Sequence, residues 1–309
     1  MIRKLIFITY ITMADISNSQ NHSGVLNAIS AYFLWGFAPI YFKLIDTINP
    51  SEILIHRILW STILLLIIII VTRKSKILTL MLKQPKVLLK LTISASFLAI
   101  NWFLFIWSIN NDHLLDASLG YFINPLFSVA LGMVFLGERL RKWQKFAVVL
   151  AIIGVLIQLM IVGSLPLISL ALAGTFGLYG LLRKKMHLDS FVGLFVESLM
   201  MLPIALTFWI FFVSSNTSNM FNNGLGLNVT LMMAGVVTTA PLLCFTAAAK
   251  RLTLSSLGFF QYIGPSIMFI LATLYYQETL QLSKMVTFAF IWLALIIYSV
   301  DSLKARKSD

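Results

Sequence analysis

The stretch that decides the fold is residues 117–159, which read ASLGYFINPLFSVALGMVFLGERLRKWQKFAVVLAIIGVLIQL. It recurs at residues 255–299 as SSLGFFQYIGPSIMFILATLYYQETLQLSKMVTFAFIWLALIIYS. Both copies carry Ser-Leu-Gly, then two aromatic residues, a proline and, thirteen residues after the proline, a glutamate. After a two-residue shift, Pro125 and Glu138 stand 140 positions before Pro265 and Glu278. Shared apolar composition does not readily reproduce landmarks in one order, so the pattern indicates an internal repeat.

The whole chain of 309 residues is as apolar as these two copies. Hydrophobic residues make up 59% and charged residues 11%, with a mean hydropathy of +0.93, whereas a soluble domain is ~25% charged. No soluble fold can expose that much apolar area, so we expect lipid as the solvent and membrane helices as the fold class. Apolar runs of about 20 residues predict ten of them, at 24–44, 52–72, 87–109, 116–136, 143–162, 165–183, 191–213, 228–249, 256–276 and 284–302.

The positive charge of the chain is distributed as a signal of membrane topology. The formal net charge is +12, from 23 Lys and Arg against 11 Asp and Glu. With ten helices, every Lys and Arg except Lys43, Arg57 and Lys284 falls on the side that holds both termini. The positive-inside rule therefore predicts cytoplasmic termini. Nucleic acid is not an expected partner, because no basic face of a soluble module exists.

A period of 140 residues over ten helices gives five helices per repeat. An odd number makes the second copy enter the membrane from the opposite side, which predicts two inverted five-helix repeats at 24–162 and 163–302. Inverted repeats are typical of secondary transporters, which hold a small-molecule substrate near the midplane and work by alternating access. The alternative is a duplicated bundle with a non-transport role, such as a membrane scaffold or sensor.

Two short segments lie outside the repeats. Residues 1–23 form an N-terminal cytoplasmic extension, in which a basic pair and a short apolar run precede Met13 and a polar stretch. We interpret Met13 as the start of translation; the alternative is an amphipathic segment lying on the membrane. Residues 303–309 form a cytoplasmic tail.

Equivalent helices of the two repeats carry polar residues beside a proline. Proline frees a backbone carbonyl, which is tolerated in a membrane helix where a cavity or a polar neighbour satisfies it. Such paired, proline-interrupted helices indicate the central site of a transporter; a packing kink without a ligand is the alternative. The residues concerned are Tyr121, Asn124 and Pro125 in one helix and Gln261, Tyr262 and Pro265 in the other.

Three ionisable residues fall inside predicted spans: His56, Arg57 and Glu197. An unpaired charge at the centre of a membrane helix costs ~2.5–3.5 kcal/mol, so such residues are candidates for function. Arg57 and Glu197 stand 140 positions apart, but inversion places them toward opposite faces, so direct pairing is not assured. We hypothesise that Glu197 is a proton-coupling carboxylate or a gate residue; a structural charge satisfied by hydroxyl groups or backbone is the alternative. His56 could titrate near neutral pH or be a buried, satisfied histidine.

The sequence lacks the motifs of enzymes and of cofactor sites. It contains no GxxxxGK[ST], HExxH or GxSxG pattern. The single cysteine, Cys244, excludes a cysteine-built metal cluster. We expect no catalytic residues, no metal and no cofactor.

Several stretches together resemble the RarD-type permeases, a branch of the EamA-like drug/metabolite transporter superfamily. They include AYFLWGFAPIYFKL (31–44), NWFLFIWSINNDHLLDASLGYFINPL (101–126), LGERLR (136–141) and TTAPLLCFTAAAKRLTLSSLGFFQYIGP (238–265), and the resemblance extends over residues 24–302. It implies an inner-membrane permease that exports or exchanges metabolites or drugs, in a branch named for a link to chloramphenicol sensitivity. It also implies a central cavity, for which it favours Trp35, Asn101, Trp102, Tyr121, Asn124, Gln261 and Tyr262.

Overall fold

The structure, a computed structural model, describes residues 2–110, 114–162, 167–212, 220, 222–275 and 282–308, which contain helices and no strands. Among the described residues, eight segments are long and apolar enough to cross a bilayer. They are His22–Lys43, Pro50–Val71, Pro85–Phe105, Lys142–Met160, Ser190–Phe211, Leu225–Arg251, Leu254–Tyr275 and Met285–Ala305. The prediction of an all-helical, multi-pass membrane protein is therefore confirmed.

The helices lie at positions in the chain close to the predicted ones. They are α1 (Ile2–Lys43), α2 (Pro50–Val71), α3 (Ser75–Leu82), α4 (Pro85–Asn110), α5 (Leu114–Leu136), α6 (Lys142–Val162), α7 (Leu167–Met186), α8 (Ser190–Phe212), α9 (Leu225–Arg251), α10 (Leu254–Gln261), α11 (Ile263–Ile270) and α12 (Leu282–Ser308). Residues 73–86, predicted as a connection, contain the short helix α3. The first helix begins at Ile2 and continues through the polar stretch after Met13.

The helices that carry Pro125 and Pro265 differ from each other. Pro125 lies inside α5, which is continuous, so it does not break its helix. The second helix ends at Gln261 and restarts at Ile263, and after Ile270 it continues as a π-helix, Leu271–Tyr275. The break lies one turn before Pro265, which has no N–H to bond the carbonyl of Gln261 four residues earlier. Glu278 lies outside the described residues.

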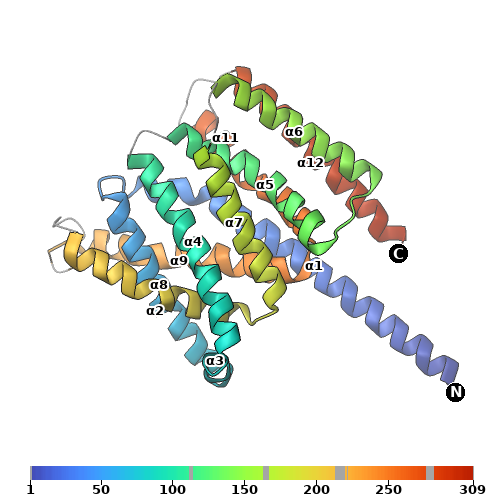
Figure 1. Cartoon of the computed structure of the whole chain (residues 1–309), viewed down its shortest axis with the longest axis horizontal. Helices are drawn as coiled ribbons and strands as arrows, with labels where there is room; N and C mark the ends of the chain where they lie inside the picture. Colours follow the sequence, from blue (N-terminus) through green and yellow to red (C-terminus); the bar gives the residue numbers. More distant parts are fainter. Residues whose placement is uncertain are drawn as a thin grey trace.

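The helices pack as a bundle from which two parts stand out (Figure 1). The first turns of α1 extend away from the bundle, and α6 lies alongside α12 at one edge. In the interior, α1 packs against α9 and α11, α2 against α8 and α9, α4 against α7 and α8, and α5 against α7 and α10. Large apolar side chains such as Val134 and Ile210 remain exposed on the outer faces, as expected for surfaces that contact lipid.

Carboxylates fix two connections of the bundle. Glu138, which follows α5, accepts hydrogen bonds from the backbone N–H groups of Leu254 (2.6 Å) and Ser255 (2.8 Å) and from the Ser255 hydroxyl (2.7 Å). Glu138 therefore caps the N-terminus of α10, because the first N–H groups of a helix lack partners within it. A carboxylate also interacts favourably with the positive end of the helix dipole.

The second carboxylate, Asp189, lies just before α8. It accepts hydrogen bonds from Lys74 Nζ (2.6 Å) and from the backbone N–H groups of Phe191 (3.0 Å) and Val192 (3.1 Å). Burial alone would raise the pKa of Asp189, but the hydrogen bonds from Lys74 and Val192 outweigh it and hold the pKa below its ordinary value. Asp189 thus stays ionised and ties α8 to the connection between α2 and α3.

The crossing of α2 and α9 depends on Gly235. A Cβ atom at this position would lie 2.6 Å from the carbonyl carbon and 2.7 Å from the carbonyl oxygen of Trp60. These are backbone atoms, so only separation of the helices could relieve the clash. On the same helix, a Cβ at Gly226 would meet no atom within 4 Å.

We expect Gly235→Ala to lower the free energy of unfolding by about 1–3 kcal/mol through this clash. The matched control, Gly226→Ala, should raise it by about 0.4–1 kcal/mol, because alanine restricts the unfolded chain. Unfolding of the purified protein in detergent, followed by helical circular dichroism, measures both changes. Equal stability of the two variants would contradict the close contact of α2 and α9.

Candidate functional site

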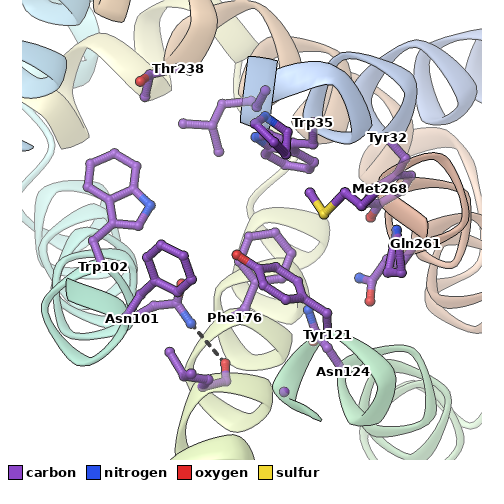
Figure 2. A pocket seen from close by; sticks show the side chains of 18 of the residues that line it. Tyr32, Trp35, Asn101, Trp102, Tyr121, Asn124, Phe176, Thr238, Gln261 and Met268 are labelled. Atoms are coloured by element: carbon purple, nitrogen blue, oxygen red, sulfur yellow. Dashed lines mark hydrogen bonds between the residues drawn. The ribbon is translucent and has the colours of Figure 1, made fainter. Parts of the chain in front are cut away.

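A cavity of about 290 Å³ lies among the helices of the bundle. It receives side chains from α1, α2, α4, α5, α7, α9, α10 and α11. Figure 2 shows rings and amide groups converging on it from several sides. Six of the seven predicted cavity residues line it: Trp35, Asn101, Trp102, Tyr121, Asn124 and Gln261. Pro265 and Arg57 also contribute to the lining, whereas Pro125, His56 and Glu197 do not.

The seventh predicted residue, Tyr262, points away from the cavity. Its side chain is 1% exposed, and its hydroxyl donates a hydrogen bond to the carbonyl of Phe122 (3.2 Å). Successive helical residues point about 100° apart, so Gln261 facing the cavity turns Tyr262 toward α5. Tyr262 was expected in the lining and does not line this cavity.

Stacked aromatic rings close one end of the cavity. The Trp35 ring lies 5.9 Å from Phe176 and 6.0 Å from Phe245, measured between centroids. Behind them, Tyr179 stacks on Phe245 at 5.9 Å, and both side chains are almost completely buried. At the other end, Tyr121 is 41% exposed. Buried rings therefore border the cavity near Phe245, whereas the side chain of Tyr121 in its lining is partly exposed.

Arg57 gives the cavity a positive charge. Its Nε donates a hydrogen bond to Thr238 Oγ1 on α9 (2.9 Å). The guanidinium carbon lies 4.8 Å from the centroid of the Trp102 ring and 5.6 Å from that of Phe42, within the range of cation–π attraction. Among the described residues that line the cavity, no other is charged.

Amide groups supply the neutral polar surface. Asn101 Nδ2 donates to the carbonyl of Leu172 (2.8 Å) and to Thr175 Oγ1 (3.0 Å), which fixes α4 against α7. Gln261 Nε2 donates to Ser128 Oγ (3.3 Å). Asn124 Oδ1 is buried and has no hydrogen-bond partner in the described part of the chain. This oxygen can accept a hydrogen bond from a bound molecule.

The other two predicted ionisable residues lie in protein contacts. His56 is 1% exposed; its Nδ1 accepts a hydrogen bond from Trp60 Nε1 (3.3 Å), and its ring packs against Trp209. Glu197 is fully buried, with one carboxylate oxygen 3.4 Å from Arg183 Nη1 and the other 3.4 Å from the Tyr179 hydroxyl. Arg57 and Glu197 therefore do not form an ion pair with each other.

Sequence reasoning missed Arg183 as a partner of Glu197. It was grouped with Lys184 and Lys185 as a topology signal, but it is 2% exposed. Helical periodicity contains a signal that separates them, because Arg183 follows Tyr179 by four residues and Phe176 by seven. Arg183 thus falls on the buried face of α7. Phe176 and Met268 were missed as lining residues because apolar side chains in a membrane helix carry no distinguishing signal.

A multi-pass helical bundle with an amphipathic cavity lined from most of its helices is the architecture typical of a membrane transporter. Comparison with known proteins gives the family. The model of the EamA-like transporter family matches residues 22–160. An uncharacterized transporter of Vibrio cholerae is 56% identical over 282 residues, or 91% of this chain and 93% of that protein. The protein RarD of Escherichia coli K12 is 50% identical over 288 residues, or 93% and 97%.

The chain therefore belongs to the EamA-like transporter family, as a RarD-type member, and is a multi-pass protein of the inner membrane. A more distant relative, the chloramphenicol-sensitive protein RarD of Pseudomonas aeruginosa, is 29% identical and covers 93% of this chain and 96% of its own. A solved protein structure superposes with a TM-score of 0.70 over 90% of this chain and 98% of its own, at 16% identity. That likeness shows the fold alone.

Proposed function

We propose that the protein is a secondary-active permease that carries a small solute by alternating access, exporting or exchanging a metabolite or drug-like molecule. The observation that carries the proposal is the cavity, which draws α1, α2, α4 and α5 from the first predicted repeat and α7, α9, α10 and α11 from the second. A site between two repeats can open to either side when one half rocks against the other.

Helix caps support two inverted repeats. Asn49 Oδ1 accepts a hydrogen bond from the Ser51 N–H at the start of α2 (3.0 Å). Asp189 Oδ1 accepts one from the Phe191 N–H at the start of α8 (3.0 Å). The two caps have the same spacing and lie 140 positions apart, as do Pro125 and Pro265.

The contacts between helices are also equivalent in the two predicted repeats. α1 packs against α9 as α7 packs against α4, and α2 packs against α9 as α8 packs against α4. Likewise, α5 packs against α7 as α11 packs against α1. This pattern is expected if α1, α2, α4, α5 and α6 correspond to α7, α8, α9, α10–α11 and α12. Counting α5 and α7 as spans then gives ten membrane helices in two repeats.

The charge distribution supports an orientation with both termini in the cytoplasm. In that orientation the cavity residues of α1, Ala38 and Phe42, lie near the outer end of their helix, and Arg57 lies near the outer end of α2. The stacked Tyr179 and Phe245 rings then close the cytoplasmic half. The arrangement corresponds to an outward-facing state of an alternating-access cycle.

The Arg183–Glu197 pair belongs to the closed half, so we assign Glu197 to the inner gate. A gate requires contacts that hold one half closed and can be exchanged for others. The buried pair joins α7 to α8 within the second predicted repeat, and Glu197 also accepts a hydrogen bond from Tyr179, whose ring stacks on Phe245. Proton coupling through Glu197 is the competing role, and it predicts that transport by Glu197→Gln no longer depends on pH, whereas a gate role changes the rate and leaves the pH dependence.

Filling the cavity tests the transport function. We expect Ala38→Trp to reduce transport at least tenfold, because its side chain would occupy the space between Trp35 and Phe42. The matched control is Ala130→Trp, on a position of α5 that is exposed on the outside of the bundle. The measurement compares metabolite efflux and uptake in a deletion strain complemented with wild type or either variant, at equal membrane abundance.

The same comparison tests the alternative of a scaffold or sensor. A non-transporting bundle would complement the deletion equally well with Ala38→Trp and with Ala130→Trp. Equal solute profiles for wild type and Ala38→Trp would therefore contradict the proposed function.

A further inference from the structure

We infer that the cavity recognises an organic carboxylate with an aromatic body and no positive charge, held at its carboxylate by Arg57. The inference rests on the proposed transport function and specifies the class of solute. It starts from Arg57, which brings a permanent positive charge into a cavity between membrane helices.

The guanidinium has no anionic partner among the residues that the structure describes. Its Nε donates to Thr238, but its two Nη groups make no hydrogen bond with any described residue. No described carboxylate lies within ion-pair distance of Arg57; Glu197 pairs with Arg183, and Asp46 pairs with Lys43. A charge in a membrane protein normally has a partner or faces a water-filled path. A bound anion supplies such a partner at this site.

The guanidinium is also held in a defined position. Its contacts with the rings of Trp102 and Phe42 and with Thr238 come from three different helices. A fixed, planar group with two N–H edges suits the two oxygens of a carboxylate, which it can bind through parallel hydrogen bonds. Fixing it beforehand reduces the entropy lost on binding.

The rest of the lining indicates which kind of group the solute carries besides its carboxylate. Rings of Trp35, Phe105, Tyr121 and Phe176 face the cavity, and aromatic rings prefer edge-to-face or offset contacts with another ring. Asn124 Oδ1 and Gln261 Oε1, both without a hydrogen-bond partner in the described part of the chain, offer acceptors for hydroxyl or N–H groups. The described lining holds no carboxylate to pair with an ammonium group. A net anion therefore fits better than a zwitterion or a cation.

The experiment compares ligands of nearly equal shape on the purified full-length protein in nanodiscs. The probes are 3-(4-hydroxyphenyl)propionate, its primary amide, tyrosine, tyramine and acetate, and calorimetry measures their affinities. We expect the aryl carboxylate to bind at least tenfold more tightly than the amide, tyrosine or tyramine. Acetate, which has no ring, should bind at least tenfold more weakly than the aryl carboxylate.

Variants identify the group responsible. We expect Arg57→Gln to weaken carboxylate binding tenfold or more and to leave binding of the amide within about twofold, whereas Arg57→Lys should retain part of the preference. The matched control, Lys43→Gln, removes an exposed charge outside the cavity and should change neither. The wild-type ranking tests the inference even if Arg57→Gln does not fold.

The outcomes separate this inference from the proposed function. Equal or tighter binding of the amide, tyrosine or tyramine, or no binding of the aryl carboxylate, overturns the carboxylate class. Neither result bears on the proposed transport function. That function is tested separately by the comparison of Ala38→Trp with Ala130→Trp. Transport without a preference for carboxylates would leave the permease and refute only the assignment of Arg57.

Discussion

Replacing Glu197 by leucine is expected to lower the free energy of unfolding by about 3–5 kcal/mol, because it leaves Arg183 buried without its counter-charge. Arg183 is 2% exposed and Glu197 is fully buried, so water cannot replace the lost partner. The Nε and Nη2 atoms of Arg183 already have no hydrogen-bond partner in the described part of the protein. No other described group therefore compensates the charge of Arg183 when the carboxylate is removed, and we expect the full loss of stability.

The double variant Arg183→Met/Glu197→Leu should recover most of this loss. It removes both charges together and substitutes apolar side chains, and buried ion pairs replaced in this way are often neutral or stabilising. A double-mutant cycle in detergent measures the coupling between the two positions. Equal destabilisation by the single and double variants would contradict the assigned pair.

An exposed ion pair provides the control. Lys43 and Asp46 lie 3.6 Å apart at the surface. Exposed pairs contribute about 0–1 kcal/mol at most. We therefore expect Asp46→Asn to leave stability nearly unchanged, so that a large effect of Glu197→Leu reports burial rather than charge in general.

The sequence predicts the bundle and most of the cavity, because both apolar spans and polar residues within them can be recognised directly in the sequence of a membrane protein. Apolar runs give the spans, and the repeat directs attention to the helices around Pro125 and Pro265. Within those helices, polar and aromatic residues that lipid would reject, such as Asn101 and Asn124, must face protein or water. This reasoning finds six of the seven predicted cavity residues.

The sequence does not show which side of each helix faces the cavity, or which residues contact one another between helices. Of the adjacent residues Gln261 and Tyr262, only Gln261 faces the cavity, and the polar and aromatic composition of the segment does not tell them apart beforehand. Arg183 and Glu138 show a different limit. Each belongs to a run of charges near the end of a span, where a topology signal, a buried ion pair and a helix cap share one composition. Helical periodicity places Arg183 on the buried face of α7, but its partner Glu197 and the cap that Glu138 makes on α10 are seen only in the contacts.

Cysteine labelling should show that the cavity opens to the outside of the cell. In a Cys244→Ser background, Ala38→Cys places a thiol in the cavity lining with the addition of a single sulfur atom. We expect a membrane-impermeant thiol reagent, added to intact cells, to label Ala38→Cys efficiently. Ala248→Cys, on a fully buried position of α9 beyond the aromatic seal, is the matched control and should stay unlabelled.

The direction of labelling decides between two orientations of the same bundle. The positive-inside rule places the cavity end of α1 outside, so reagent added to intact cells can reach Ala38→Cys without crossing lipid. Labelling only in inside-out vesicles would contradict this orientation. A solute that occupies the cavity should protect Ala38→Cys, because the thiol lies between Trp35 and Phe42 in the space that the solute fills. Labelling at Ala38→Cys that no solute reduces, in a protein that still transports, would mean that the solute takes another path.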